Sequence, residues 1–179
     1  MIIGKVKLAS PSAEDALTNM LINNNLINKD TAILCLGTND CIEDLVGPLT
    51  GTLIEENKKD LSIKVYGTLD FSINSLNIKS KFPHIEKKEK HLLAVDSILS
   101  LKNDVGMILL KNDGIHPGAA LGNNLPLIGD CSIMCSVSEK LQYLLLNKKV
   151  SFNEVYKFSK VICSSIIKAK YILENHHNN

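Results

Sequence analysis

Short apolar runs recur along the chain, separated by longer segments of mixed character. The run at residues 31–36 is followed directly by Gly37, a pattern typical of a buried parallel strand that ends in a turn. Most of the separating segments are long enough to hold crossover helices. The pattern therefore predicts an α/β fold: a three-layer α/β/α sandwich around a mostly parallel sheet, with its strands in five runs, at residues 31–36, 62–66, 92–96, 105–111 and 131–137.

Helical spacing of apolar positions marks the segments between and beyond these runs. The clearest case is the C-terminal segment, where Ser151 and Glu154 form a capping-box pattern ahead of apolar residues spaced for one helical face. Pro83 is expected to stop an earlier helix. The helices expected are a first one that starts near Pro11, ends in residues 23–25 and precedes the sheet, a second over residues 45–57, a third over 72–82 and a last over 151–174.

Composition adds limits to this picture. The chain has 179 residues, of which 45% are hydrophobic, enough to form one domain over residues 1–179 without disulfides or metal clips. All 20 basic residues are lysine, against 19 acidic residues, so the formal net charge is +1. Without arginine or a basic field, nucleic acid is not expected as a partner.

The cysteines and the hydropathy pattern point to a protein inside a cell. The five cysteines are an odd number and lie mostly in apolar runs, which favours reduced core thiols over disulfides. Cys131 and Cys135 are four apart with no second pair and no nearby histidine, so burial is a better explanation than zinc. No stretch approaches a membrane span, and the histidines at 176 and 177 lie in a polar tail expected to be irrelevant to function.

Acidic residues follow the predicted strands at the edge where ligands of parallel sheets collect. Asp96 directly ends an apolar run, and Asp44 lies in the polar segment after the first predicted strand. Either residue could simply cap a helix or turn, and for Asp96 capping is the better-supported interpretation from the residues alone. Two such acids could instead share a proton, one acting as base toward water and the other as acid toward a leaving group.

Other catalytic patterns are weaker. Gly37 fits a strand-to-helix turn, but no GxGxxG fingerprint, Walker lysine or GxSxG elbow is present, so no cofactor is expected. The glycine-containing loop at residues 113–130 is long enough to suggest a function. It carries His116, the one histidine placed plausibly near the strand ends, although an exposed loop histidine is the more ordinary interpretation. Asp130, at the start of a predicted strand, should lie at the edge opposite the site.

Several segments together resemble the YyaC-type sporulation proteins, relatives of germination protease. The resemblance spans about residues 30–150, and its specificity comes from the combination of motifs. The segments that carry it are GTNDCIEDLVGPLTG (37–51), VYGTLD (65–70), SLNI (75–78), LLAVDSIL (92–99) and HPGAALGNNLPLIGDCSI (116–133).

The resemblance implies a phosphorylase/hydrolase-like α/β/α fold shared with germination protease and with hydrogenase-maturation endopeptidases. The two aspartates thought essential in germination protease match Asp44 in EDLVGP and Asp96 in AVDS. The implied substrate is a small acid-soluble spore protein or another spore protein, in the cytoplasm of the forespore or the spore interior. Gly37, Thr38, Asn39 and His116 are the expected substrate-binding residues.

The sequence also departs from its relatives. After the first glycine-threonine those proteins usually have an acidic and then a basic residue, where this chain has Asn39 and Asp40. The glycine-proline ahead of their proline-glycine loop is replaced by residues 113–116. Hydrogenase-maturation enzymes hold nickel with a glutamate, an aspartate and a histidine. Asp44 and Asp96 could stand for the first two and His116 for the third, but no bound metal is predicted.

Three functions remain open at this point. The leading one is a sporulation-associated peptidase whose aspartate pair activates water. A non-catalytic spore protein could use the same cleft to bind a peptide or partner, and a metal-centred processing endopeptidase is the third. Homo-oligomers are possible.

Overall fold

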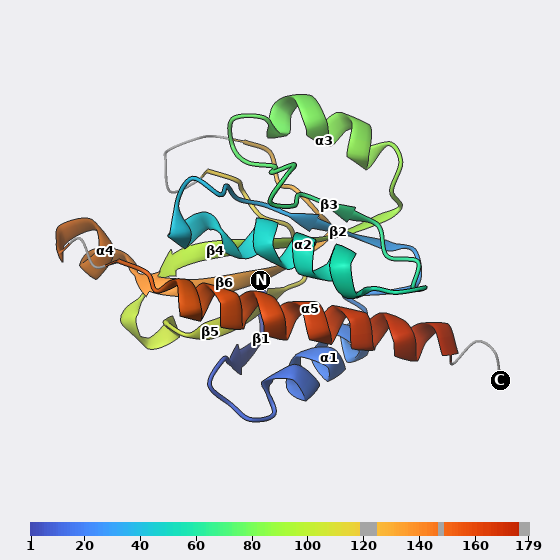
Figure 1. The fold of residues 1–179 in the computed structure, drawn as a ribbon, viewed down its shortest axis with the longest axis horizontal. Coiled ribbons are helices and arrows are strands. Elements are labelled where there is room, and N and C mark those ends of the chain that lie inside the picture. Colours follow the sequence, from blue (N-terminus) through green and yellow to red (C-terminus); the bar gives the residue numbers. More distant parts are fainter. Residues whose placement is uncertain (119–124, 147–148, 176–179) are drawn as a thin grey trace.

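The computed structural model describes residues 1–118, 125–146 and 149–175. The two terminal histidines and part of the loop after His116 therefore lie outside the described residues. A six-stranded sheet forms the middle of the fold, in the order β1-β5-β6-β4-β2-β3 (Figure 1). Its strands are β1 (Ile2–Lys7), β2 (Thr31–Cys35), β3 (Val65–Tyr66), β4 (His91–Ser100), β5 (Met107–Lys111) and β6 (Cys131–Glu139).

Most of the sheet is parallel. β2 pairs in parallel with β3 and β4, and β4 pairs in parallel with β6. β5 is antiparallel to both of its neighbours, β1 and β6, so it alone runs against the other strands. The connection from β4 to β5, which contains only the short 3-10 helix η2 (Lys102–Asp104), is too short for a parallel crossover.

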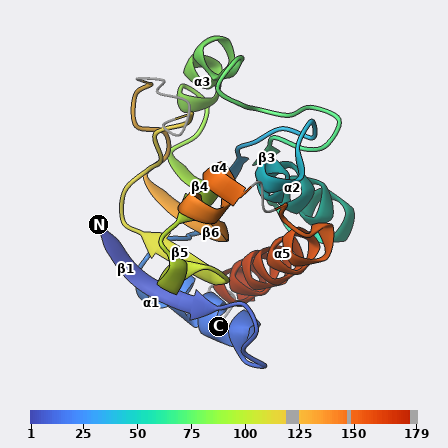
Figure 2. The ribbon, with the colours of Figure 1, turned by 90° about the vertical axis from the view of Figure 1, so that its left-hand side faces the viewer.

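Helices cover both faces of the sheet (Figure 2). On one face, α1 (Ala13–Asn23) and α2 (Val46–Asn57) both pack against α5 (Phe152–Asn175), and this layer shares the larger hydrophobic core with the sheet. The other face is covered by α3 (Ile78–Glu86) together with Ile115, Leu125 and Ile128 of the long loop. The predicted α/β fold is confirmed, with a second helical layer thinner than the first.

Several expected elements were wrong in detail. The first helix does not precede the sheet, because β1 comes before it and pairs with β5 at the sheet edge. β1 has only Val6 buried, so its apolar signal is weak. Pro83 does not stop α3 but lies inside it; the ring removes one backbone donor, while Ile78 and Ile85 still anchor the helix in the core.

Helix α4 (Lys140–Leu146) was not expected at all, and it follows β6 without a break. No side chain of α4 is buried, and several of its leucines are among the exposed large hydrophobic residues. The predicted strand at residues 62–66 shrinks to the two residues of β3. Within the described residues, no helix is long and apolar enough to cross a bilayer.

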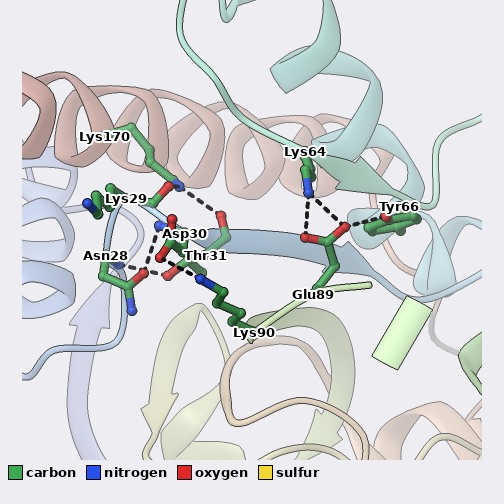
Figure 3. A network of polar contacts seen from close by, with 9 residues as sticks. All are labelled: Asn28, Lys29, Asp30, Thr31, Lys64, Tyr66, Glu89, Lys90 and Lys170. Carbon is green, nitrogen blue, oxygen red and sulfur yellow. Dashed lines mark hydrogen bonds and ion pairs between the residues drawn. The ribbon is translucent and has the colours of Figure 1, made fainter. Parts of the chain in front are cut away.

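Polar contacts at the start of β2 and near β3 tie the layers together (Figure 3). Lys170 of α5 is fully buried, and its Nζ donates to the carbonyl oxygens of Lys29 at 2.9 Å and Thr31 at 2.8 Å. Burial lowers the pKa of Lys170 to about 8. Beside β3, the side chain of Glu89, only 3% exposed, accepts hydrogen bonds from Lys64 and from the Tyr66 hydroxyl.

Candidate active site

Asp44 lies in the segment that follows the end of β2, and Asp96 lies in β4 one residue past the last residue paired with β2. The expectation that Asp96 ends its strand was wrong, because β4 stays paired with β6 as far as Ser100. From β2 the chain passes through α2 to β3 on one side, whereas β4, reached through α3, lies on the other side of β2. The ends of β2 and β4 are thus a topological switch point, the position at which open α/β sheets usually bind ligands.

Close backbone packing positions Asp44. Gly37 has φ +135°, and a Cβ there would lie 2.1 Å from the Asp44 carbonyl oxygen. The loop therefore folds back on itself, and the Thr38 N–H donates to that same carbonyl at 3.1 Å. At the start of α2, a Cβ on Gly47 would lie 1.9 Å from the Leu36 carbonyl oxygen, so only glycine lets the helix approach the end of β2 this closely. These contacts hold the 3-10 helix η1 (Ile42–Asp44) against the strand end.

The Asp44 carboxyl is partly buried, and its acidity is changed accordingly. Burial raises its pKa from 3.8 to about 6, and the neighbouring charge of Glu43 acts in the same direction. The Thr38 amide and the Ser97 side chain oppose this change by hydrogen bonding to the carboxylate. Asp44 is therefore ionised at neutral pH and titrates within the range where a general base is useful.

Asp96 is the sixth residue of β4 and lies opposite Met134 of β6. Its Oδ1 accepts the Ser97 N–H at 2.7 Å, but no helix or turn begins there, so the expected capping role reduces to a contact with the next residue of the same strand. Burial raises the pKa of Asp96 well above its ordinary value, and the charge of Asp44 raises it further. Burial and the charge of Asp44 thus both favour the protonated form of Asp96, and the two carboxyl groups interact electrostatically.

Three neighbours of the pair were not identified as functional from the sequence. Ser97 connects the two acids, with its N–H on Asp96 and its side chain on Asp44. Cys41 is partly exposed, and its thiol pKa is raised by burial and by the charges of nearby acids, including Asp44. The Tyr143 hydroxyl of α4 donates to Glu43. The contacts of the Ser97 side chain and of Tyr143 join separate elements, so neither has a local sequence signal.

The expected substrate-binding residues are placed less closely together. Gly37 makes the turn described above. Thr38 donates its hydroxyl to Asp40 at 2.8 Å, and Asn39, also in this loop, donates to the Leu69 carbonyl at 3.2 Å. His116 is exposed, and its Nδ1 lies 3.1 Å from the Leu125 carbonyl oxygen within its own loop. The described contacts of His116 do not bring it to the aspartate pair.

Asp130 lies at the opposite edge of the sheet. Its Oδ2 accepts the Leu92 N–H at 2.8 Å, and its own N–H donates to the Leu92 carbonyl at 2.9 Å. These bonds join the beginnings of β4 and β6, so the role of Asp130 is structural.

The donor set around the pair does not suit a metal ion. Among the described residues, no three histidine, cysteine, aspartate or glutamate side chains are grouped as a metal site requires. Two cavities, of about 800 Å³ beside β3 and about 720 Å³ between α2 and α5, also lie away from the pair, since neither is lined by Asp44 or Asp96.

Comparisons with known proteins agree with the geometry as far as they reach. Over 142 residues the chain is 29% identical to the uncharacterized protein YyaC of Bacillus subtilis (strain 168), covering 77% of this chain and 68% of YyaC. The crystal structure of a [NiFe] hydrogenase maturation protease, HycI from Thermococcus kodakarensis KOD1, superposes with a TM-score of 0.51 at 12% identity, covering 84% of this chain and 98% of that one. These findings confirm the YyaC-type resemblance and the HycI-like fold. A family described as "Protein of unknown function (DUF1256)" matches residues 5–165, and the chain therefore belongs to the DUF1256 family.

Proposed function

We propose that this protein is a peptidase-like hydrolase that cleaves a spore protein, with Asp44 as general base and Asp96 as general acid. The observation that carries the proposal is the interaction of two carboxyl groups from separate elements, each with a pKa that burial raises. Interacting acids whose environments shift their pKa values in this way are typical of acid–base catalysis. The fold shared with a maturation protease supports the same class of chemistry.

In the proposed reaction, the Asp44 carboxylate takes a proton from a water molecule, and the water oxygen attacks the peptide carbonyl carbon. Asp96 donates its proton to the peptide and the leaving amine departs, so the C–N bond breaks as the C–O bond forms. Proton transfer from Asp44 back to Asp96, directly or through solvent, restores the starting state. Ser97 contacts both acids, since its N–H donates to Asp96 and its side chain favours the ionised form of Asp44.

The proton states give a pH dependence. Cleavage should rise as pH increases through about 6, because Asp44 must be ionised to act as a base. It should fall again at higher pH, where Asp96 loses its proton. A bell-shaped profile of kcat/KM is therefore expected, and its two limbs belong to the coupled pair and not to one residue each.

The test uses a purified small acid-soluble spore protein as substrate and mass spectrometry to identify fragments. Wild type should cleave it, whereas Asp44→Asn and Asp96→Asn should each lower kcat by at least about 100-fold. Asp60→Asn, at an exposed position outside the site, is the matched control and should retain wild-type activity. Equal activity in all four proteins, or no cleavage by wild type, would contradict the proposal.

Two further outcomes separate the alternatives. Binding of the spore protein by wild type and both active-site variants, without fragments from any of them, would identify a non-catalytic binding protein. Loss of wild-type cleavage on chelator treatment, with recovery on adding nickel or zinc, would identify a metal-centred enzyme instead.

A further inference from the structure

We infer that the edge of β4 at residues 96–100 binds an extended peptide as an added strand beside the aspartate pair. This inference rests on the proposed function, because the bound peptide would be its substrate. Strand addition at an exposed sheet edge is a recurring mode of peptide recognition in which main-chain hydrogen bonds supply affinity.

β4 continues past the end of its neighbour β2. The two strands pair through residues 91–95 of β4, and the last contact is the Leu36 N–H donating to the Val95 carbonyl at 2.8 Å. Gly37 then turns the chain out of the sheet. Residues 96–100 pair with β6 on one side only, and in the described part of the chain no strand pairs with their other side. We call this unpaired side the open edge.

The main-chain groups along the open edge follow from strand alternation. The Val95 carbonyl points toward β2, so the N–H and C=O groups of Ser97 and Leu99 point toward the space that β2 has left. A bulge interrupts the ladder here, but the additional residue, Val137, belongs to β6, so the alternation of β4 continues unbroken.

The hydrogen bonding and exposure of residues 96–100 are those of a strand edge that has no neighbouring strand. The Ser97 N–H is bonded to the carboxylate of Asp96, the residue before it, in place of a neighbouring strand. All five residues from 96 to 100 keep part of their surface exposed. Outside the ladder with β6, no main-chain hydrogen bond of the described residues involves the Ser97 carbonyl or either main-chain group of Leu99, and the first residue of this edge is Asp96 itself.

Charge and side-chain surface indicate which peptide fits. Asp40, Glu43 and Asp44 lie on the loop that borders the open edge, and among the described residues none of the three forms an ion pair with a lysine or histidine. Exposed apolar side chains accompany both segments: Ile42, in the same loop as the acids, is 42% exposed, and Leu101, directly after the open edge in the chain, is 80% exposed. The occupant is thus an unfolded segment that combines basic residues with alternating apolar ones.

The test begins with binding. Immobilised Asp44→Asn protein, which should bind without cleaving, is exposed to a random library of twelve-residue peptides. Peptides with lysine or arginine and alternating apolar positions should be enriched, and their binding should weaken as salt concentration rises. The best binder is then synthesised with N-methyl groups at alternate residues, which removes main-chain donors. Two such peptides are possible, methylated at the odd or at the even residues, and one of them should bind at least about tenfold more weakly than the unmethylated peptide.

A protein variant tests the other side of the same bonds. Leu99→Pro removes a donor on the open edge, whereas Leu99→Ala, its matched control, loses the side chain and keeps the N–H. We expect at least about tenfold weaker peptide binding for the proline variant than for the alanine variant. If the proline variant does not fold, the N-methylated peptides still decide the question.

The outcomes separate this inference from the proposed function. Cleavage by wild type that neither Leu99→Pro nor N-methylation slows would overturn the open edge as the binding site and leave the aspartate pair standing. Peptide binding that depends on the edge, with no cleavage by wild type, would do the reverse. No enrichment of any peptide, or a dimer in sedimentation that Leu99→Pro dissociates, would also overturn the inference, the second because another copy of the chain occupies the edge.

Discussion

Replacing Asp44 with asparagine should make the fold more stable at alkaline pH while it abolishes the proposed activity. The carboxylate is ionised and partly buried in the folded protein, which is why its pKa is raised from 3.8 to about 6. A difference of this size corresponds to about 3 kcal/mol at most, and partial exposure to solvent reduces it to about 1–2 kcal/mol. Asparagine has nearly the same shape and no charge, so it avoids this cost.

The sign of the effect follows from proton binding. Between pH 3.8 and about 6 the folded protein binds more protons at Asp44 than the unfolded chain does, so wild-type stability falls as pH rises through this window. The asparagine variant does not follow that fall. Its stability relative to wild type should therefore be about 1–2 kcal/mol greater at pH 8 than at pH 4.

The assay is urea denaturation of wild type and Asp44→Asn at pH 4 and pH 8, followed by circular dichroism. Any hydrogen bond that asparagine makes less well contributes at both pH values, so the change with pH isolates the charge. Asp60→Asn controls for removal of an exposed carboxylate. A stability difference that is the same at both pH values, or that favours wild type more at pH 8, would refute the assignment of Asp44 as a destabilising buried base.

Three other perturbations test parts of the fold that position the site. Gly47→Ala should lower the free energy of unfolding by more than about 3 kcal/mol, because its Cβ would lie 1.9 Å from a backbone oxygen. Gly106→Ala is the control: its φ is +79° and no atom lies within 4 Å of the added Cβ, so it should cost only about 1 kcal/mol. Similar losses for the two variants in urea denaturation would contradict this reasoning. The free energy of unfolding of the wild type should rise between pH 8 and pH 10.5, because in this range Lys170 keeps its proton in the unfolded chain and has lost it in the folded protein. Lys170→Met should show a smaller rise over the same pH range. Tyr143→Phe removes the bond from α4 to η1 and should speed hydrogen exchange in α4 with less than about 1 kcal/mol loss of stability; unchanged exchange would show that α4 is held by other contacts.

Apolar runs and helical spacing in the sequence predicted the strands and helices that form from such local patterns. The apolar run before Gly37 and the long amphipathic segment after Ser151 both correspond to elements of the structure, β2 and α5. β1 escaped prediction because an edge strand with one buried residue carries little hydrophobic pattern. The reversed direction of β5 could not be predicted from its composition, since an apolar run has no direction.

At the candidate site, too, some residues could be identified from sequence patterns and others could not. Asp44 and Asp96 were selected by a rule about strand ends, and the structure brings their charges into interaction, although their catalytic roles stay a prediction. The contact of the Ser97 side chain with Asp44 could not be anticipated, because it depends on β4 extending past β2 and on a loop from another part of the chain reaching that side chain. His116 was chosen by position in a glycine-containing loop, and its described contact remains within that loop.

The distribution of thiols provides a natural labelling position beside the candidate site. Cys35, Cys131, Cys135 and Cys163 are buried, and burial raises the pKa of each thiol, which leaves them slow to react with alkylating reagents. Cys41 alone among the cysteines is partly exposed, and it lies beside Asp44. A maleimide dye should therefore label the native protein at one position without any engineering. The labelling rate would then show directly when a molecule arrives next to the acids.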